Sequence, residues 1–209
     1  MVMPNSSISP FEVEKFRHKA AEAGDITLFK SLYAAKFKEI PNKNISAKWD
    51  KINLLQSHEL SNSPIYIDKI RTVLSLIGSS NGNLLDVGFG AGIVTPLINK
   101  EKFKMFGTDI SRKSVDRIKR SINGNFRVGN ILKIPFKGSC FDVVIVLDVL
   151  EHISPSKIFK ALSEVNRVSR VGGTLIVSVP LNEGLGDMVR RGNNPNAHVR
   201  VYTPSILNT

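Results

Sequence analysis

A glycine-rich turn is the part of this sequence best suited to hold a ligand. An apolar run at residues 84–87 is followed by Gly88, Gly90 and Gly92, and the pattern predicts a helix from Ile93 onward. Glycine adopts positive φ at little cost and lets a ligand approach the backbone closely. The first N–H groups of a helix also attract an anion. A ligand site is therefore expected at this turn.

A carboxylate follows the next apolar run, residues 105–108. Asp109 there could accept hydrogen bonds from two adjacent hydroxyls, which suits a ribose diol; alternatively, it assists the cap of a helix that starts at Ser111. A dinucleotide-binding turn would read G-x-G-x-x-G, but counting from Gly88 places Ile93 where the third glycine belongs. An NAD-dependent oxidoreductase thus remains a disfavoured alternative.

Strands and helices alternate after residue 81, which predicts an α/β domain with a parallel sheet. In such sheets ligands bind at the carboxyl ends of the strands. Helices are expected after Ser111 and after the Ser154-Pro155 pair, the second ending at Gly172-Gly173. The expected strands are residues 84–87, 105–108, 126–128, 141–147 and 174–179.

The first part of the chain has a helical pattern instead. Three helices are expected, beginning near Ser9, Asp25 and Ser63, and the third should end at Gly78. A turn-rich stretch around residues 78–82 separates the two patterns. We therefore divide the chain into an N-terminal helical lid, residues 1–80, and an α/β domain, residues 81–209.

Composition limits the class of protein. The chain has 209 residues, 42% hydrophobic residues and a mean hydropathy of −0.03, and it has no apolar run near the roughly 18 residues of a membrane-spanning helix. It shows no secretory signal, so a cytoplasmic protein is expected. Cys140 is the only cysteine, which excludes an internal disulfide. The net charge of +11 favours anionic partners such as nucleic acid, although scattered cations also form ordinary solvated surfaces.

Several linked motifs resemble class I S-adenosylmethionine (SAM) dependent methyltransferases, in particular the "type 11" branch. They are LLDVGFGAG at residues 84–92, FDVVIVLDVLEHI at 141–153, and the helix and strand pattern at 162–175. The resemblance implies a Rossmann-like fold, a mostly parallel sheet with helices on both faces. It also implies SAM as cofactor and S-adenosylhomocysteine (SAH) as product.

The resemblance also implies which residues hold the cofactor. The glycine turn would hold the aminoacyl end of SAM, Asp86 would lie near its amino group, and Asp109 would bind the ribose. Asn130 stands where the family more often has Asp, and its side-chain oxygen could accept from the adenine amino group. The full predicted cofactor set is Asp86, Gly88, Gly90, Gly92, Asp109, Ile110, Asn130, Ile131, Leu147 and Asp148.

The reaction implied is in-line methyl transfer to an O, N or C nucleophile, with a small molecule as the expected acceptor. His152 and His198 are the candidates for a general base, because the pKa of a histidine can lie near 7. Asp148, Glu151 and these two histidines also loosely resemble the metal clusters of a few methyltransferases. The Glu-His pair is also common in metal-free members, and we expect no metal.

The family sheet usually has seven strands, the last two forming a hairpin beside the fifth. This sequence ends within the next predicted helix, so the last two strands are expected to be missing, by truncation or in a shorter sheet. Residues 174–179 would then form an apolar edge, which we expect another segment or a second subunit to cover. The alternative function is a non-catalytic SAM-binding scaffold that acts through its basic surface.

Overall fold

The computed structural model describes residues 46, 49–50, 53, 63–98, 100–182, 198 and 202–207. These residues fall into two compact units, which we describe separately. The larger unit holds residues 46–150 and 156–179, and the smaller holds 151–155, 180–182, 198 and 202–207. The predicted helices starting at Ser9 and Asp25 lie outside the described residues, and the division at residue 80 stays a prediction.

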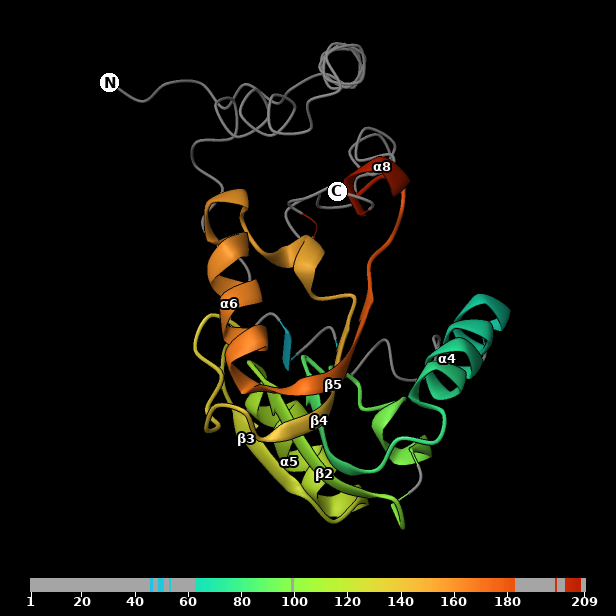
Figure 1. Ribbon diagram of the computed structural model, residues 1–209. Helices are drawn as coiled ribbons and strands as arrows, with labels where there is room; N and C mark the ends of the chain where they lie inside the picture. The colour runs from blue at the N-terminus through green and yellow to red at the C-terminus, as the bar shows by residue number, and fades with distance from the viewer. Residues whose placement is uncertain are drawn as a thin grey trace, which may run out of the picture. The chain divides into compact units, whose positions relative to one another are not determined.

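The larger unit is built on a five-stranded, fully parallel sheet with the strand order β3-β2-β1-β4-β5 (Figure 1). The chain leaves β1 toward β2 on one side and later returns to pair β4 on its other side. A parallel sheet has its ligand-binding crevice where the strand order reverses in this way. The predicted Rossmann-like class is confirmed. The strands are β1 (Gly82–Val87), β2 (Phe103–Asp109), β3 (Asn125–Val128), β4 (Phe141–Leu147) and β5 (Ser169–Ser178).

Three helices flank this sheet: α4 (Pro64–Ile77), α5 (Arg112–Ser121) and α6 (Ile158–Val168). Proline at the first position of α4 and Gly78 at its end, with φ 54°, set the bounds that the sequence predicts. Ser111 caps α5, because its hydroxyl oxygen accepts the N–H of Ser114 at 3.0 Å. Among the described residues, no helix combines the length and the apolar composition needed to cross a membrane.

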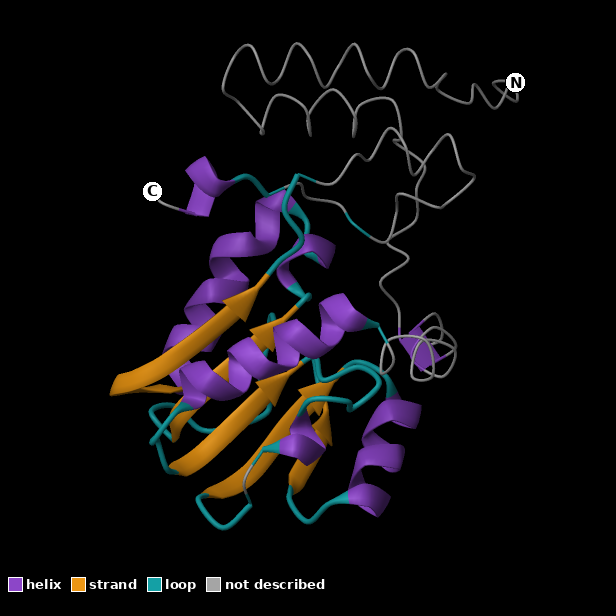
Figure 2. Ribbon diagram, turned by 90° about the vertical axis from the view of Figure 1, so that its right-hand side faces the viewer, coloured by secondary structure: helices purple, strands orange, loops and turns teal. Residues whose placement is uncertain are grey.

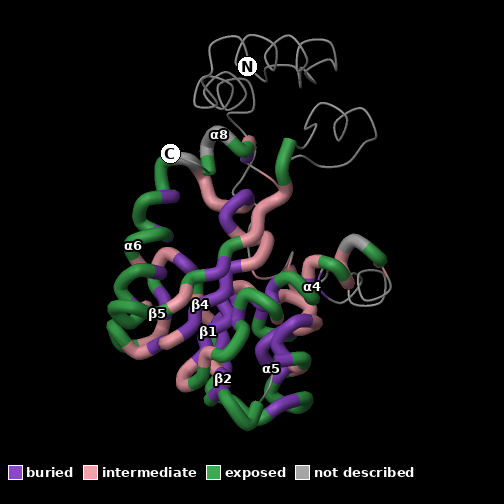
Figure 3. The backbone as a smooth tube through the Cα atoms, turned by 45° about the vertical axis from the view of Figure 1, so that its right-hand side comes forward, coloured by how far each residue is buried: buried purple, intermediate pink, exposed green. Residues whose placement is uncertain are grey.

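The two faces of the sheet are covered by different helices (Figure 2). Apolar side chains of α4 and α5 pack with Val143 and Ile145 of β4 in one buried cluster. Val144 and Val146 alternate with them and therefore point to the other face. Both neighbours of β1 are paired in register, with Leu84 between Met105 and Val143. Figure 3 shows the buried residues concentrated along these central strands.

The segment after the glycine turn differs from the prediction. Instead of an α-helix from Ile93, a short 3-10 helix, η1 (Thr95–Leu97), follows the turn. Pro96 lacks an N–H and fixes its own φ, and three successive β-branched residues precede it, which lowers helix propensity. The predicted helix at this position is therefore wrong.

The end of α6 also differs. The helix stops at Val168, and β5 begins at Ser169, so Gly172 and Gly173 lie inside the strand rather than before it. A register shift between Phe141 and Val143 accommodates the extra residues of β5. Leu162 of α6 is 39% exposed, although its spacing from the buried Ile158 and Val165 is helical.

The smaller unit contains the end of the 3-10 helix η2 (Leu150–His152) and the short helix α8 (Pro204–Leu207). A parallel bridge joins Leu181 to Tyr202, and the N–H of Asn182 donates to the Tyr202 carbonyl at 2.9 Å. The ring of Tyr202 is buried, 5% exposed. A third 3-10 helix, η3 (Pro155–Lys157), leads into α6.

Candidate functional site

The glycine turn lies at the carboxyl end of β1 and has the backbone that the sequence predicts. Gly88, Gly90 and Gly92 have φ values of 75°, 53° and 69°, which only glycine adopts easily. The N–H of Gly88 donates to the Thr108 carbonyl at 2.7 Å and so ties the turn to the end of β2. A Cβ on Gly88 would lie 2.4 Å from Cγ2 of Val149. The first position of the turn is therefore closed to any side chain.

Asp109, at the end of β2, is hydrogen-bonded to the glycine turn. Its Oδ2 accepts the N–H of Gly90 at 2.8 Å, and its Oδ1 accepts the N–H of Ser111 at 2.7 Å. Burial raises the pKa of this carboxyl, while the two backbone donors lower it. The Ser111 contact fits the capping interpretation. Because each carboxylate oxygen has two lone pairs, the diol interpretation stays open as well.

Asp86, within β1, is a buried carboxyl beside this turn, 2% exposed. The hydroxyl of Thr95 in η1 donates to its Oδ2 at 2.6 Å. Burial raises the pKa of Asp86 to about 7, the Thr95 hydrogen bond opposes this, and the charge of Asp109 adds to it. A cationic ligand group beside this buried carboxyl would favour its ionised form. The sequence analysis had no signal for Thr95.

A helical stretch before α4 contacts the glycine turn and the start of α5. The hydroxyl of Ser111 donates to Oδ1 of Asp50 at 2.5 Å, which is the main reason that the pKa of Asp50 is lowered. The amide nitrogen of Asn53 donates to the Ser114 hydroxyl at 3.0 Å. The Asn53 oxygen lies 3.4 Å from the position of a Cβ on Gly90. This stretch could not be assigned from the sequence, because its apolar residues show no clear helical periodicity.

Residues predicted to surround an adenine ring follow β2 and β3. Ile131 is buried and Ile110 is half-buried. The oxygen of the Asn130 side chain accepts the N–H of Leu132 at 2.9 Å, closing a local turn. That oxygen is thus already used once within the loop. A second lone pair is left for a ligand.

Asp148, directly after Leu147 at the end of β4, is held in place from two sides. It has a positive φ of 53°, its N–H donates to the Ser178 carbonyl at 2.9 Å, and its Oδ1 accepts the Ser178 hydroxyl at 3.0 Å. Lys69 of α4 forms an ion pair with its Oδ2 at 2.5 Å. Burial raises the pKa of Tyr66, one turn from Lys69, to about 12, and the charges of Asp148 and Asp86 add to this. No pattern in the sequence indicates that Lys69 pairs with Asp148.

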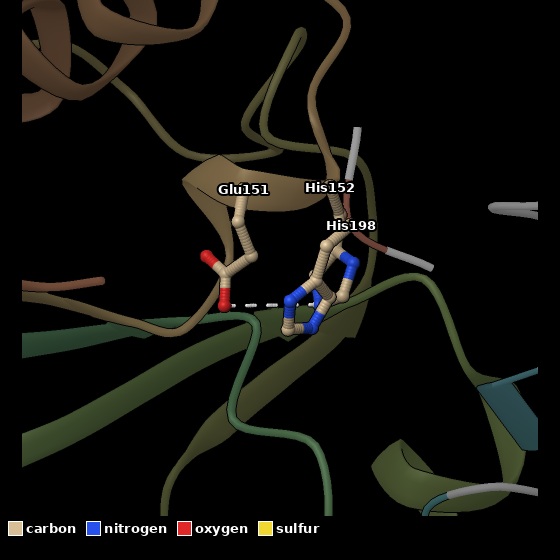
Figure 4. Close-up of side chains that lie close together, drawn as sticks. All are labelled: Glu151, His152 and His198. Atoms are coloured by element: carbon tan, nitrogen blue, oxygen red, sulfur yellow. Dashed lines mark ion pairs between the residues drawn. The ribbon is translucent and has the colours of Figure 1, made fainter. Parts of the chain in front are cut away.

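In the smaller unit, Glu151 and His152 meet His198 (Figure 4). The Glu151 side chain is fully buried, and its Oε1 lies 4.0 Å from Nε2 of His152. The two imidazole rings meet edge to face, with their centroids 4.8 Å apart. One nitrogen or oxygen from each residue lies within 4.8 Å of the others. The two predicted base candidates are thus neighbours beside a carboxylate that the sequence analysis considered only as a metal ligand.

Such a set can act in two ways. A carboxylate favours the protonated form of a nearby imidazole, so the group can accept a proton. Two imidazoles and one carboxylate are also a ligand set that Zn²⁺ takes. The expectation of no metal stays a prediction.

Comparisons with known proteins are consistent with this geometry. Residues 85–177 match the family model of a methyltransferase domain. An uncharacterized protein of Methanocaldococcus jannaschii is 35% identical over 102 residues, which are 49% of this chain and 42% of the relative. A ubiquinone biosynthesis O-methyltransferase of Pelagibacter ubique is 24% identical over 194 residues, covering 88% of this chain and 70% of the relative.

Among solved structures, a SAM-dependent methyltransferase from Archaeoglobus fulgidus superposes with a TM-score of 0.59 at 18% identity, covering 74% of this chain and 70% of that one. This likeness shows the fold. The chain spans less than half the length of the M. jannaschii relative.

Proposed function

We propose that this protein binds SAM and transfers its methyl group to an O, N or C nucleophile, because residues 85–177 match the family model of a methyltransferase domain. The observation that carries the proposal is the pair of buried carboxyls, Asp86 and Asp109, beside a glycine turn whose first position is closed to side chains. SAM presents a cationic amino group and a ribose diol, the two groups that such carboxyls recognise.

Each carboxyl has a separate role in this proposal. The pKa of Asp86 is about 7 without a ligand, so an ammonium group beside it would draw it into its ionised form. Asp109 is already oriented by the N–H groups of Gly90 and Ser111, and it would accept the diol without rearranging. Ile110, Asn130, Ile131, Leu147 and Asp148 are proposed to contact the rest of the cofactor.

When bound, SAM supplies a methyl group that its sulfonium already activates. The residues of this chain would then mainly orient the acceptor and exclude water, and positioning alone can contribute several orders of magnitude in rate. We propose that His152 and His198 accept the proton of the acceptor, with Glu151 stabilising the imidazolium that forms.

The acceptor proposed is a small molecule. The P. ubique relative is named as an O-methyltransferase. An oxygen nucleophile is the case in which a general base contributes most, because the hydroxyl must lose its proton. The second candidate, a SAM-binding scaffold without turnover, rests on the basic surface. Formation of SAH in the presence of a phenol or carboxylate acceptor panel would exclude it.

We also propose that a second subunit covers the edge of β5. Among the described residues this strand is the last of the sheet on its side, and Leu175 and Val177 on one of its faces are 47% and 41% exposed. Light scattering on the purified chain should give the mass of a dimer, and Val177→Lys should shift it to a monomer. A monomeric native chain at tens of micromolar would contradict this part of the proposal.

Calorimetric titration of SAH into the purified chain tests the cofactor site. We expect micromolar binding, which Asp109→Ala should weaken by at least tenfold, about 1.4 kcal/mol. Asp116→Ala is the matched control, because Asp116 is an exposed aspartate on α5, the helix that follows Asp109. Unchanged SAH binding by Asp109→Ala, or binding of NAD in preference to SAH, would overturn the proposed site.

A further inference from the structure

The start of β2 and the exposed face of α5 gather much of the positive charge of this protein. Between residues 100 and 121 the sequence has eight cations, and the exposed acids among them are two, Glu101 and Asp116. The third acid of the stretch, Asp109, is buried and hydrogen-bonded to the glycine turn. We define the basic face as Lys100, Lys102, Lys104, Arg112, Lys113, Arg117, Lys119 and Arg120.

This face contains a hollow of about 650 Å³. Lys100 and Lys104 line it from the side of β2, and Lys119 and Arg120 line it from the last turn of α5. All four side chains are exposed, and no acidic residue of the described chain lines the hollow. Its volume lies in the range of pockets that hold a ligand of nucleotide size.

The other residues that line the hollow limit the kind of ligand that it could bind. The floor is apolar but closed, because Phe103, Met105 and Ile122 are at most 7% exposed. Asn123, on the turn between α5 and β3, and Asn125, the first residue of β3, add amide groups that donate and accept hydrogen bonds. A face that inserts into a lipid surface would instead need apolar side chains projecting between its cations.

The hollow is not the cofactor site. It lies at the amino ends of β2 and β3, whereas the glycine turn and Asp109 follow the carboxyl ends of β1 and β2. The seven residues of β2 separate the two ends by about 20 Å. The remaining cations of the basic face lie along α5, whose ten residues span about 15 Å.

We propose that the basic face binds the sugar-phosphate backbone of a single-stranded nucleic acid, with one nucleotide in the hollow and further phosphates along α5. Lysine and arginine on a groove that tracks a backbone are the usual means of binding single strands without sequence preference. This binding uses none of the proposed cofactor residues directly, although Arg117 of the basic face also donates to the Gly90 carbonyl at 3.3 Å. It does not depend on methyl transfer.

Fluorescence anisotropy with a labelled twelve-nucleotide oligouridine RNA, and with the oligothymidine DNA, tests the proposal on the full chain. We expect micromolar affinity for RNA at 50 mM KCl and a steep fall by 200 mM. About four neutralised phosphates would give a slope of log K against log salt near −3. The Lys104→Glu/Lys119→Glu/Arg120→Glu variant should bind at least tenfold more weakly and with a flatter slope.

A matched variant separates a local site from net charge. Lys137→Glu/Lys157→Glu/Lys160→Glu changes the charge by the same amount at exposed positions before β4 and around the start of α6. It should retain most of the affinity, and both variants should keep the SAH binding and melting temperature of the native chain. The proposal fails if the native chain does not bind RNA at 50 mM KCl, if the two variants lose affinity equally, or if only acidic phospholipid vesicles bind. Equal binding of the DNA would support recognition of the phosphates alone, and preference for RNA would add a contact to the 2′-hydroxyl.

Discussion

The hydroxyl of Thr95 donates a 2.6 Å hydrogen bond to Oδ2 of Asp86, and both residues are buried. Thr95→Val keeps the shape of the side chain and removes the donor. At pH 8, where Asp86 is mostly ionised, we expect the free energy of unfolding to fall by about 1.5–3 kcal/mol, the range for a hydrogen bond to a charged group.

At pH 5 the carboxyl is protonated, and the loss should be about 1 kcal/mol. Urea unfolding at the two pH values measures both. Thr72→Val is the control, because the Thr72 hydroxyl bonds the Asp68 carbonyl on the exposed side of α4. An equal loss at pH 5 and pH 8 would show that Thr95 does not act through the charge of Asp86.

The raised pKa of Asp86 gives the protein a pH dependence of stability with a defined sign. Because its pKa is about 7 in the folded chain and near 3.8 when exposed, the folded state holds this proton more tightly. The stability that this provides is complete below pH 4 and is lost as the pH rises through 7. The free energy of unfolding of Asp86→Asn should therefore depend less on pH between 4 and 7 than that of the native chain.

Cofactor binding should release the proton that Asp86 holds in the folded chain. If an ammonium group of SAH pairs with Asp86, the carboxyl ionises, and titration at pH 6 should release about one proton. Calorimetry in two buffers of different ionisation enthalpy counts the protons. Zero release by the native chain would mean that the amino group binds elsewhere, and Asp86→Asn should release none.

Two glycines with the same backbone angle separate strain from crowding. Gly88 has φ 75° and Gly172 has φ 77°, but a Cβ meets Val149 at 2.4 Å in the first case and nothing within 4 Å in the second. Gly172→Ala should cost about 1–2 kcal/mol of unfolding free energy, the penalty of a left-handed residue. Gly88→Ala should cost clearly more and abolish SAH binding.

The Val149→Ala background checks the cause. There, Gly88→Ala should become less costly, because the crowding methyl is gone, although the backbone strain remains. Thermal unfolding of the four chains gives the coupling energy. If the cost of Gly88→Ala is unchanged in that background, Val149 is not what closes the turn.

Removing metal should leave the reaction unchanged. With Glu151, His152 and His198 acting as a proton-accepting group, dialysis against EDTA should not alter kcat, whereas His152→Ala and His198→Ala should each lower it by about 10²-fold for a hydroxyl acceptor. Measuring kcat again after stoichiometric Zn²⁺ has been added back tests the alternative, in which these residues hold a metal ion. Loss of kcat on dialysis and its recovery with Zn²⁺ would identify these residues as metal ligands instead.

Sequence reasoning was most reliable where local chemistry fixes an element. Ser63-Pro64 and Gly78 set the bounds of α4, Ser111 caps α5, and the unbroken apolar run of residues 141–147 is β4 as expected. Each of these signals acts within a few residues, so one sequence is enough to read it. The family model of a methyltransferase domain matches residues 85–177, in agreement with the resemblance that the motifs indicate.

The features that the sequence did not predict depend on contacts between residues far apart in the chain. Nothing near Asp148 indicates that Lys69, 79 residues earlier, pairs with it, and nothing near Ser111 indicates Asp50. Thr95 lies in a 3-10 turn that Pro96 imposes, and the sequence analysis expected an α-helix there. Long-range partners of this kind are set by the tertiary fold, which local patterns do not encode.

The position of β1 in the sheet has a consequence for how the chain acquires its structure during synthesis. Its partner β2 begins 21 residues after it starts, but its other partner, β4, begins 59 residues after it starts. Until residues 141–147 have left the ribosome, one edge of β1 and the apolar side chains of Leu84 and Leu85 have no partner strand. Pairings of this sequence separation form slowly and leave such edges open to aggregation. The centre of the sheet, the most buried part of the finished protein, is therefore the part that a nascent chain must protect longest.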